Sequence, residues 1–97
     1  MCAPSRIPAE RLEQFLEQVG ELNPDAIKFD GFDAAIIGCG NQFTKDAILI
    51  YDEMLMVDIL IEQGMTVDEA WEYLSFNTWG AWLGESTPIV MRSGIDC

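Results

Sequence analysis

The spacing of apolar residues changes along this chain, and that change constrains the fold more than any other feature. From positions 9, 53 and 67 onward, apolar side chains recur at helical intervals, whereas Ala34–Ile37 and Ala47–Tyr51 are short continuous apolar runs. Such runs, bounded by turn residues, are typical of strands that are buried on both faces or lie in the middle of a small sheet. The pattern therefore predicts helices combined with a small sheet.

The first segment predicts an amphipathic helix that begins after Pro8 and ends at Gly20 and Asn23-Pro24. Proline is favoured in a first helical turn because its missing N–H group has no partner there in any case. Four apolar residues fall at i, i+3, i+4 and i+7 on one face: Leu12, Phe15, Leu16 and Val19. Four glutamates form a stripe on a different face: Glu10, Glu13, Glu17 and Glu21.

The two apolar runs predict paired strands joined by a wide hairpin loop over Gly38–Asp46. Asp52 is expected to cap a following helix over residues 53–63, which is apolar nearly all round except for Asp58 and Glu62. A helix of that composition is expected to lie centrally.

Thr66 and Glu69 match a capping box, which predicts the start of another helix over residues 67–77. The helical spacing predicts these buried residues: Val67, Ala70, Trp71, Leu74 and Phe76. It predicts these exposed ones: Asp68, Glu69 and Glu72.

A third strand is expected over Thr87–Met91, and Pro88 within it indicates a sheet edge, because proline cannot donate a ladder hydrogen bond. The predicted fold class is therefore α+β. It has a three-stranded antiparallel or mixed sheet covered by helices, in the order α-β-β-α-α-β. At 97 residues the chain has room for a single domain over positions 1–97.

Negative charge is the strongest compositional signal. Seventeen acidic residues against five basic ones give a formal charge of −12, and no Lys or Arg lies between Lys45 and Arg92. Such a field repels nucleic acid and anionic membranes and attracts basic surfaces. No stretch approaches the roughly 20 apolar residues of a membrane helix, and the first residues lack the apolar core of a secretory signal. We expect a cytoplasmic protein with no direct contact with nucleic acid or membrane.

The sequence offers little for catalysis or metal binding. Histidine is absent, which removes the commonest general base and transition-metal ligand. The carboxylate pairs Asp30/Asp33 and Asp52/Glu53 are typical of caps and solubilising charge, and no EF-hand spacing is present. Three scattered cysteines form neither a disulfide framework nor a metal motif: Cys2, Cys39 and Cys97. We expect a non-enzymatic protein without cofactor or metal.

Carboxylates on helices are the best candidates for partner binding, because their spacing of ~5–6 Å loosely imitates the phosphates of a nucleic acid. The alternative is an ordinary solvated face. Trp79 and Trp82 are either core residues or partner anchors, since tryptophan is enriched in interface hot spots. The candidate partner-binding residues are Glu10, Glu13, Glu17, Glu21, Asp58, Glu62, Asp68, Glu69, Glu72, Trp79 and Trp82.

Four motifs between positions 29 and 91 carry a resemblance to a known group of proteins: Phe32-Asp33, Tyr51-Asp52, Met65-Thr66 with Glu69-Ala70, and the ending Asn77–Pro88, which reads N-x-x-G-A-W-x-G-E-x-T-P. In these motifs the chain resembles short uncharacterised proteins of bacteriophages and mobile elements. The resemblance implies a phage-like setting, in which small acidic proteins often block a host defence enzyme. It implies no catalytic residues, and it leaves out the glutamate-bearing first helix.

The first functional hypothesis is an inhibitor that binds a basic surface of a host nucleic-acid-handling complex of the anti-CRISPR or anti-restriction type. A second is a small-ligand or metal-binding module that uses Gly38–Asp46 and Trp79–Glu85. A structural or interaction protein without a defence role and a minimal carboxylate hydrolase are further alternatives. Nearly half the residues are apolar in a chain this short, so a homo-oligomer is also expected.

Overall fold

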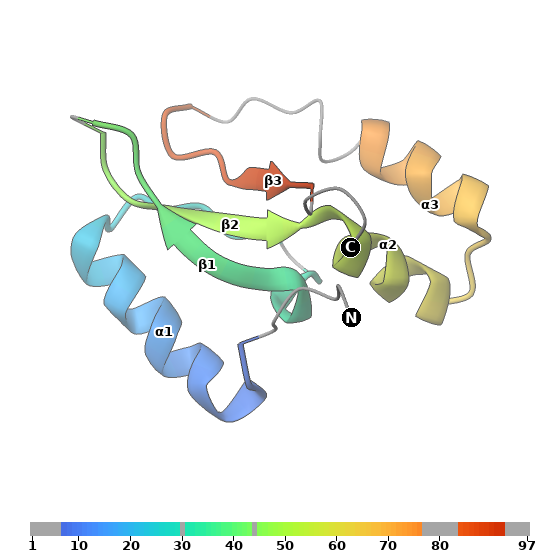
Figure 1. Cartoon of the computed structure of the whole chain (residues 1–97), viewed down its shortest axis with the longest axis horizontal. Helices are drawn as coiled ribbons and strands as arrows, with labels where there is room; N and C mark the ends of the chain where they lie inside the picture. The colour runs from blue at the N-terminus through green and yellow to red at the C-terminus, as the bar shows by residue number, and fades with distance from the viewer. Residues whose placement is uncertain (1–6, 30, 44, 77–83, 93–97) are drawn as a thin grey trace.

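The computed structural model of this chain describes residues 7–29, 31–43, 45–76 and 84–92. Its elements follow the predicted order α-β-β-α-α-β, with one additional 3₁₀ turn (Figure 1). They are α1 (Ala9–Leu22), η1 (Asp33–Ala35), β1 (Ile36–Gly40), β2 (Ile48–Asp52), α2 (Glu53–Glu62), α3 (Val67–Leu74) and β3 (Ile89–Met91). The α+β prediction is confirmed.

The sheet is mixed, with strand order β1-β2-β3. β1 pairs antiparallel with β2, and β2 pairs parallel with β3. The run that contains Leu49 and Tyr51 is therefore the middle strand, one of the two positions that its apolar composition allowed. Pro88 precedes β3, which lies at a sheet edge as predicted.

β1 and β2 begin one or two residues later than the apolar runs that predicted them. β1 begins at Ile36 because Asp33–Ala35 form a 3₁₀ turn, and it continues through Gly38 and Gly40. The pairing register shifts between Ile36 and Gly38, which is an irregularity of the β-bulge type. The prediction that Gly38 begins the hairpin loop was therefore wrong, since ladder hydrogen bonds to β2 extend the strand through both glycines.

One face of the sheet is packed against α1 and the segment that follows it. Val19 of α1 is buried, and the predicted stripe residues Leu12, Phe15 and Leu16 pack against the same core. The helix runs past Gly20 to Leu22, so the predicted stop at that glycine was too early. A single glycine costs only about 1 kcal/mol in a helix interior, and packing of the stripe offsets that cost.

Polar contacts join segments that are distant in sequence. The Asn23 side-chain amide, just after α1, donates hydrogen bonds to the carbonyl oxygen of Ala47 at 2.8 Å and to Ser86 Oγ at 3.2 Å. The Phe29 N–H group donates to the hydroxyl oxygen of buried Tyr51 at 2.8 Å. These bonds attach the segment after α1 to the central strand and to the segment before β3.

The two later helices begin as the sequence predicts. The Asp52 side chain accepts a hydrogen bond from the Leu55 N–H group at 2.9 Å and caps α2. Thr66 and Glu69 form both hydrogen bonds of the capping box at the start of α3. α2 buries Leu55, Met56, Val57 and Leu60, in agreement with a central position.

Two predictions about the burial of α3 were wrong. Val67 is 53% exposed and Phe76 is 79% exposed, whereas Ala70 and Leu74 are fully buried. α3 is a short element whose regular part ends at Leu74, so only one narrow stripe of it reaches α2. Helical spacing predicted the correct buried face of α3, but it could not predict how wide that face is.

Within the described ranges, no helix is both long and apolar enough to cross a bilayer.

Candidate binding surfaces

The helix carboxylates occupy two separate regions of the surface. All four α1 glutamates are exposed: Glu10, Glu13, Glu17 and Glu21. Five of the six acidic residues of the α2–α3 pair are exposed as well, all except Glu53: Asp58, Glu62, Asp68, Glu69 and Glu72. α1 lies beneath β1 at one side of the molecule, whereas α2 and α3 pack together at the other (Figure 1). The structure therefore divides the predicted partner-binding set into an α1 surface and an α2–α3 surface.

Neither surface is neutralised by ion pairs in the described part of the chain. The three ion pairs found there are Lys28–Asp33, Lys45–Glu85 and Arg92–Glu53, with N–O distances of 3.3, 2.6 and 3.0 Å. None of them involves a carboxylate of the two helix surfaces. Arg11 lies on α1, whereas the stretch from α2 to α3 contains no basic residue. The α2–α3 surface is thus the more purely anionic of the two.

Glu69 has a structural role in addition to its charge. Its carboxylate accepts a hydrogen bond from the Thr66 N–H group at 2.9 Å, and its own N–H group donates to Thr66 Oγ1 at 3.2 Å. Hydrogen bonding from the Thr66 backbone and hydroxyl lowers the pKa of Glu69 below its ordinary value of 4.5. Because this carboxylate holds the α3 N-terminus, it is less free to meet a partner than its neighbours are.

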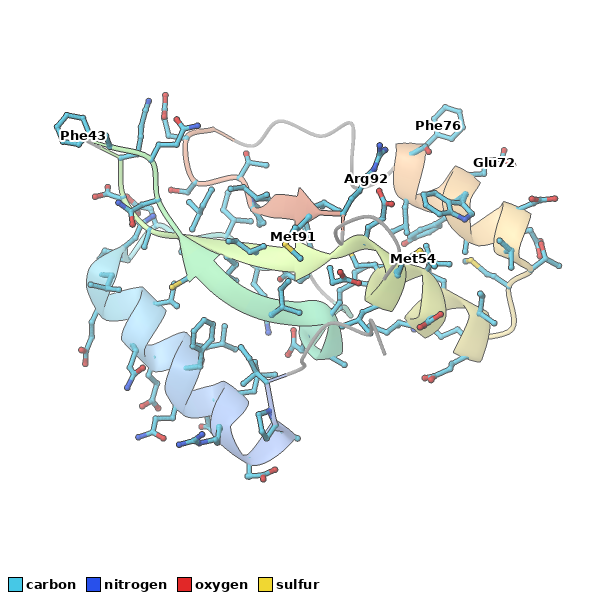
Figure 2. The ribbon with its side chains drawn as sticks, viewed as in Figure 1. Phe43, Met54, Glu72, Phe76, Met91 and Arg92 are labelled. Carbon is cyan, nitrogen blue, oxygen red and sulfur yellow. The ribbon has the colours of Figure 1, made fainter. Side chains whose placement is uncertain are left out.

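An exposed aromatic ring accompanies the carboxylates of α3. Phe76 projects from the C-terminal end of this helix, near Glu72 (Figure 2). Tyr73 is also exposed on the same helix. Aromatic side chains are enriched in the buried centre of interfaces, whereas charged side chains are typical of the solvated rim. Trp79 and Trp82, the predicted aromatic anchors, lie outside the described residues.

The carboxylate pairs considered for catalysis have other partners. Asp52 caps α2, Glu53 accepts a hydrogen bond from Arg92 Nε, and Asp33 pairs with Lys28. Asp30 lies outside the described residues. No cluster of three or more Cys, Asp or Glu side chains suited to a metal ion occurs among the described positions. Cys39 packs against the core from β1 and is half-buried.

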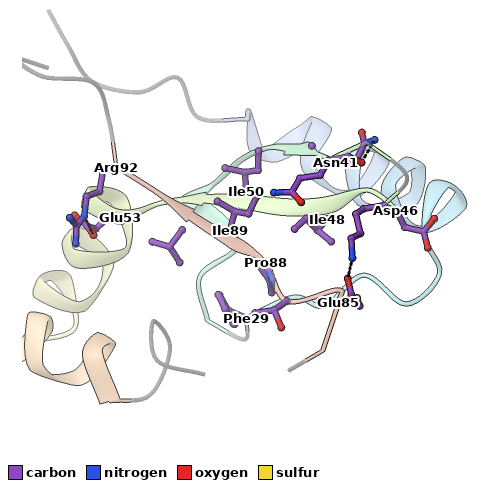
Figure 3. Close-up of a pocket in the computed structure, with 15 residues that line it drawn as sticks. Phe29, Asn41, Asp46, Ile48, Ile50, Glu53, Glu85, Pro88, Ile89 and Arg92 are labelled. Carbon is purple, nitrogen blue, oxygen red and sulfur yellow. Dashed lines mark hydrogen bonds and ion pairs between the residues drawn. The ribbon is translucent and has the colours of Figure 1, made fainter. Parts of the chain in front are cut away.

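Sequence reasoning missed an open groove along β2 and β3 with a volume of about 1180 Å³. Its apolar lining consists of Ile48, Ile50 and Ile89, together with Phe29, Pro88 and Val90 (Figure 3). The Lys45–Glu85 ion pair lies at one end and the Arg92–Glu53 ion pair at the other. The first pair joins the predicted ligand loop to the segment containing Glu85, 40 residues further along the chain.

The groove follows from the register of the sheet. Gly38, Ile50 and Ile89 are aligned across the three strands, and Gly40 pairs with Ile48 in the next row. These positions alternate with Leu49 and Tyr51, whose side chains are buried on the opposite face. The sequence signal was present as the period-two alternation of strand side chains, but it gave no indication of which face lacks a cover.

Comparisons with known proteins found no matching family model, no matching curated protein and no matching solved structure.

Proposed function

We propose that this chain is a non-enzymatic, cytoplasmic binding protein whose α2–α3 surface docks on a basic protein surface. The observation that carries the proposal is the combination on these helices of carboxylates without ion pairs in the described structure and an exposed aromatic residue, Phe76. Carboxylates steer a basic partner and set the orientation, while the aromatic ring supplies desolvated contact area.

The proposed target is the nucleic-acid-binding surface of a host defence complex, of the CRISPR or restriction type. Such a surface is basic because it must neutralise phosphates, and an array of helix carboxylates is complementary to it. The resemblance of the chain to short phage and mobile-element proteins supports the setting. The protein would then inhibit by competing with nucleic acid for one surface.

Two matched variants test which helix surface binds. The first replaces four α2–α3 carboxylates by amides: Asp58→Asn, Glu62→Gln, Asp68→Asn and Glu72→Gln. The second makes the same number of changes on α1: Glu10→Gln, Glu13→Gln, Glu17→Gln and Glu21→Gln. Glu69 is retained in both variants because it caps α3. Because each variant removes four charges, the net charge is matched and only the location differs.

The measurement is capture from a host lysate, identification of the retained protein by mass spectrometry, and binding of that purified protein to each variant. We expect the α2–α3 variant to lose most of the binding and the α1 variant to keep it. Binding should weaken steeply between about 0.05 and 0.5 M salt, because exposed charges are screened over a Debye length of roughly 10 Å or less. Binding that ignores both salt and the α2–α3 changes would exclude the proposal.

A second candidate function is supported by the groove. The Lys45–Glu85 ion pair joins the loop between β1 and β2 to the segment before β3, and both residues line the groove. A ligand with an apolar body and a polar end would fit such a lining. Thermal-shift and calorimetric titrations with nucleotides and Ca²⁺ test it, and the absence of heat and shift would remove this candidate.

A further inference from the structure

Within the described part of the chain, no helix lies over one face of the sheet, here termed the uncovered face. This face is apolar, although a solvated sheet face is normally polar. Ile48, Ile50, Ile89 and Met91 lie outside the hydrophobic core cluster, and no described helix lies over them (Figure 1). Ile89 is exposed and the other three are half-buried. Met54 at the start of α2 is exposed as well, close to where β3 ends (Figure 2). Together these side chains form an apolar patch on an otherwise acidic surface, and such a patch is a candidate site of interaction.

Two glycines make this face flat on the β1 side. A Cβ atom added to Gly38 would meet nothing within 4 Å, and one added to Gly40 would contact Ile50 Cδ1 at 3.2 Å. Both Cβ directions therefore point out of the uncovered face. A second backbone can approach β1 closely there, since neither residue carries a side chain.

The same chain carries an aromatic side chain that projects into solvent. Phe43 lies in the loop between β1 and β2 and is 93% exposed, so it does not fill the groove of its own molecule (Figure 2). An isologous interface requires that one surface carry both the projecting group and its receptor. Phe43 and the apolar groove satisfy that requirement within a single chain.

Electrostatic repulsion between two copies is weaker at this face than over the rest of the surface. With a charge of −12, two copies repel each other over most of their surfaces. The groove is different because Lys45 and Arg92, two of the four described basic residues, line it and are each paired with an acid. Among the described acids that line it, only Asp46 lacks an ion pair.

We propose that the uncovered sheet face, together with Phe43, forms a symmetric dimer interface with a second copy of this chain. The strands of the two copies run in opposite directions, so that Phe43 of each copy lies over the end of the other sheet face at which β3 ends. The receiving side chains there are Ile89 and Met91 of β3 and the exposed Met54 of α2. Methionine adapts its shape to an inserted ring and makes favourable sulfur–aromatic contacts.

The dimensions of the face predict a weak, reversible dimer. The three strands lie about 4.8 Å apart and have up to five residues each, at about 3.3 Å per residue, so the sheet face has an area of roughly 200 Å² on each copy. One inserted phenylalanine adds at most a similar area. The total is below the roughly 1,200 Å² of a standard stable interface. We therefore expect a dissociation constant in the range of about 10 µM to 1 mM.

Sedimentation equilibrium of the whole chain, from about 10 µM to 2 mM, measures this self-association directly. The Phe43→Ser and Gly38→Glu variants should each raise the dissociation constant at least about tenfold. Phe76→Ser is the matched control, because it removes another largely exposed phenylalanine at the other end of the molecule, and it should leave the constant unchanged.

Salt separates this proposal from the proposed function. Self-association of two anionic copies should strengthen as salt rises, whereas binding to a basic partner should weaken. Phe76→Ser should impair partner binding alone, and Phe43→Ser should impair self-association alone. Three outcomes would overturn the dimer proposal: a monomer throughout the range, an association insensitive to both face variants, or a mass that grows beyond two copies.

Discussion

The two faces of the sheet are built from neighbouring residues of the same strand, yet they have different environments. Leu49 is 2% exposed and Tyr51 is fully buried, with its ring centroid 5.1 Å from that of Phe29. Ile48 and Ile50, equally apolar, are only half-buried and line an open groove. The difference shows that an apolar side chain on β2 is buried only where another element packs on it. On the buried face, that element is α1 with the segment after it.

The largest expected effect is the contrast between two single substitutions on β2. Leu49→Ala should lower the free energy of unfolding by about 3 kcal/mol, because it leaves a cavity in a packed core. Ile50→Ala should cost about 1 kcal/mol, since its side chain is already partly solvated. Urea denaturation at concentrations where the chain is monomeric measures both values. Equal losses would show that the two faces are equally covered in solution.

The next largest effect is expected from removing a hydrogen bond on the covered face. Tyr51→Phe keeps the ring but removes the hydroxyl oxygen that accepts the Phe29 N–H group. We expect a loss of about 1–2 kcal/mol, the cost of leaving a partly buried donor without its partner. Denaturation curves of the Tyr51→Phe variant and the wild type provide the measurement. A neutral result would mean that water replaces the hydroxyl and that this face is less dry than its burial indicates.

A change of opposite sign is expected on the uncovered face. Gly38→Ala should raise the free energy of unfolding by about 0.5 kcal/mol, because alanine reduces the entropy of the unfolded chain and its Cβ meets open space. Gly40→Ala is the comparison variant, since its Cβ would crowd Ile50 Cδ1 at 3.2 Å. Thermal unfolding of dilute samples distinguishes the two. Destabilisation by Gly38→Ala would indicate a neighbour on this face within the folded monomer.

The smallest effect concerns pH and should be the same for variants on either face of the sheet. Because the pKa of Glu69 is lowered from its ordinary value of 4.5, its capping carboxylate stabilises the fold at pH values above 4.5. That contribution is lost as the pH falls from this value through the lowered pKa. Glu69→Gln should flatten the loss of stability in this range, measured by denaturation at a series of pH values. Leu49→Ala and Ile50→Ala should retain the wild-type slope, and an altered slope in either would link the sheet to the α3 cap.

Features set by neighbouring residues were determined by the sequence itself. The capping box at Thr66, the cap at Asp52 and the stripe on α1 were all predicted, because each depends on side chains within about one or two helical turns. The order of elements followed from the same local signals. The exposure of the helix carboxylates was likewise predicted, because their charge keeps them in water.

Only the tertiary structure decided which apolar surfaces are covered and which distant residues meet. The Lys45–Glu85 ion pair joins residues 40 positions apart, and the bulge between Ile36 and Gly38 shifts the strand beyond its apolar run. The uncovered face with Ile50 and the exposed ring of Phe76 also depend on how far α1 and α2 extend over their neighbours. The hydrophobic effect is non-directional, so the sequence determines how much apolar surface favours burial, while the arrangement of helices and strands determines which part of that surface is buried.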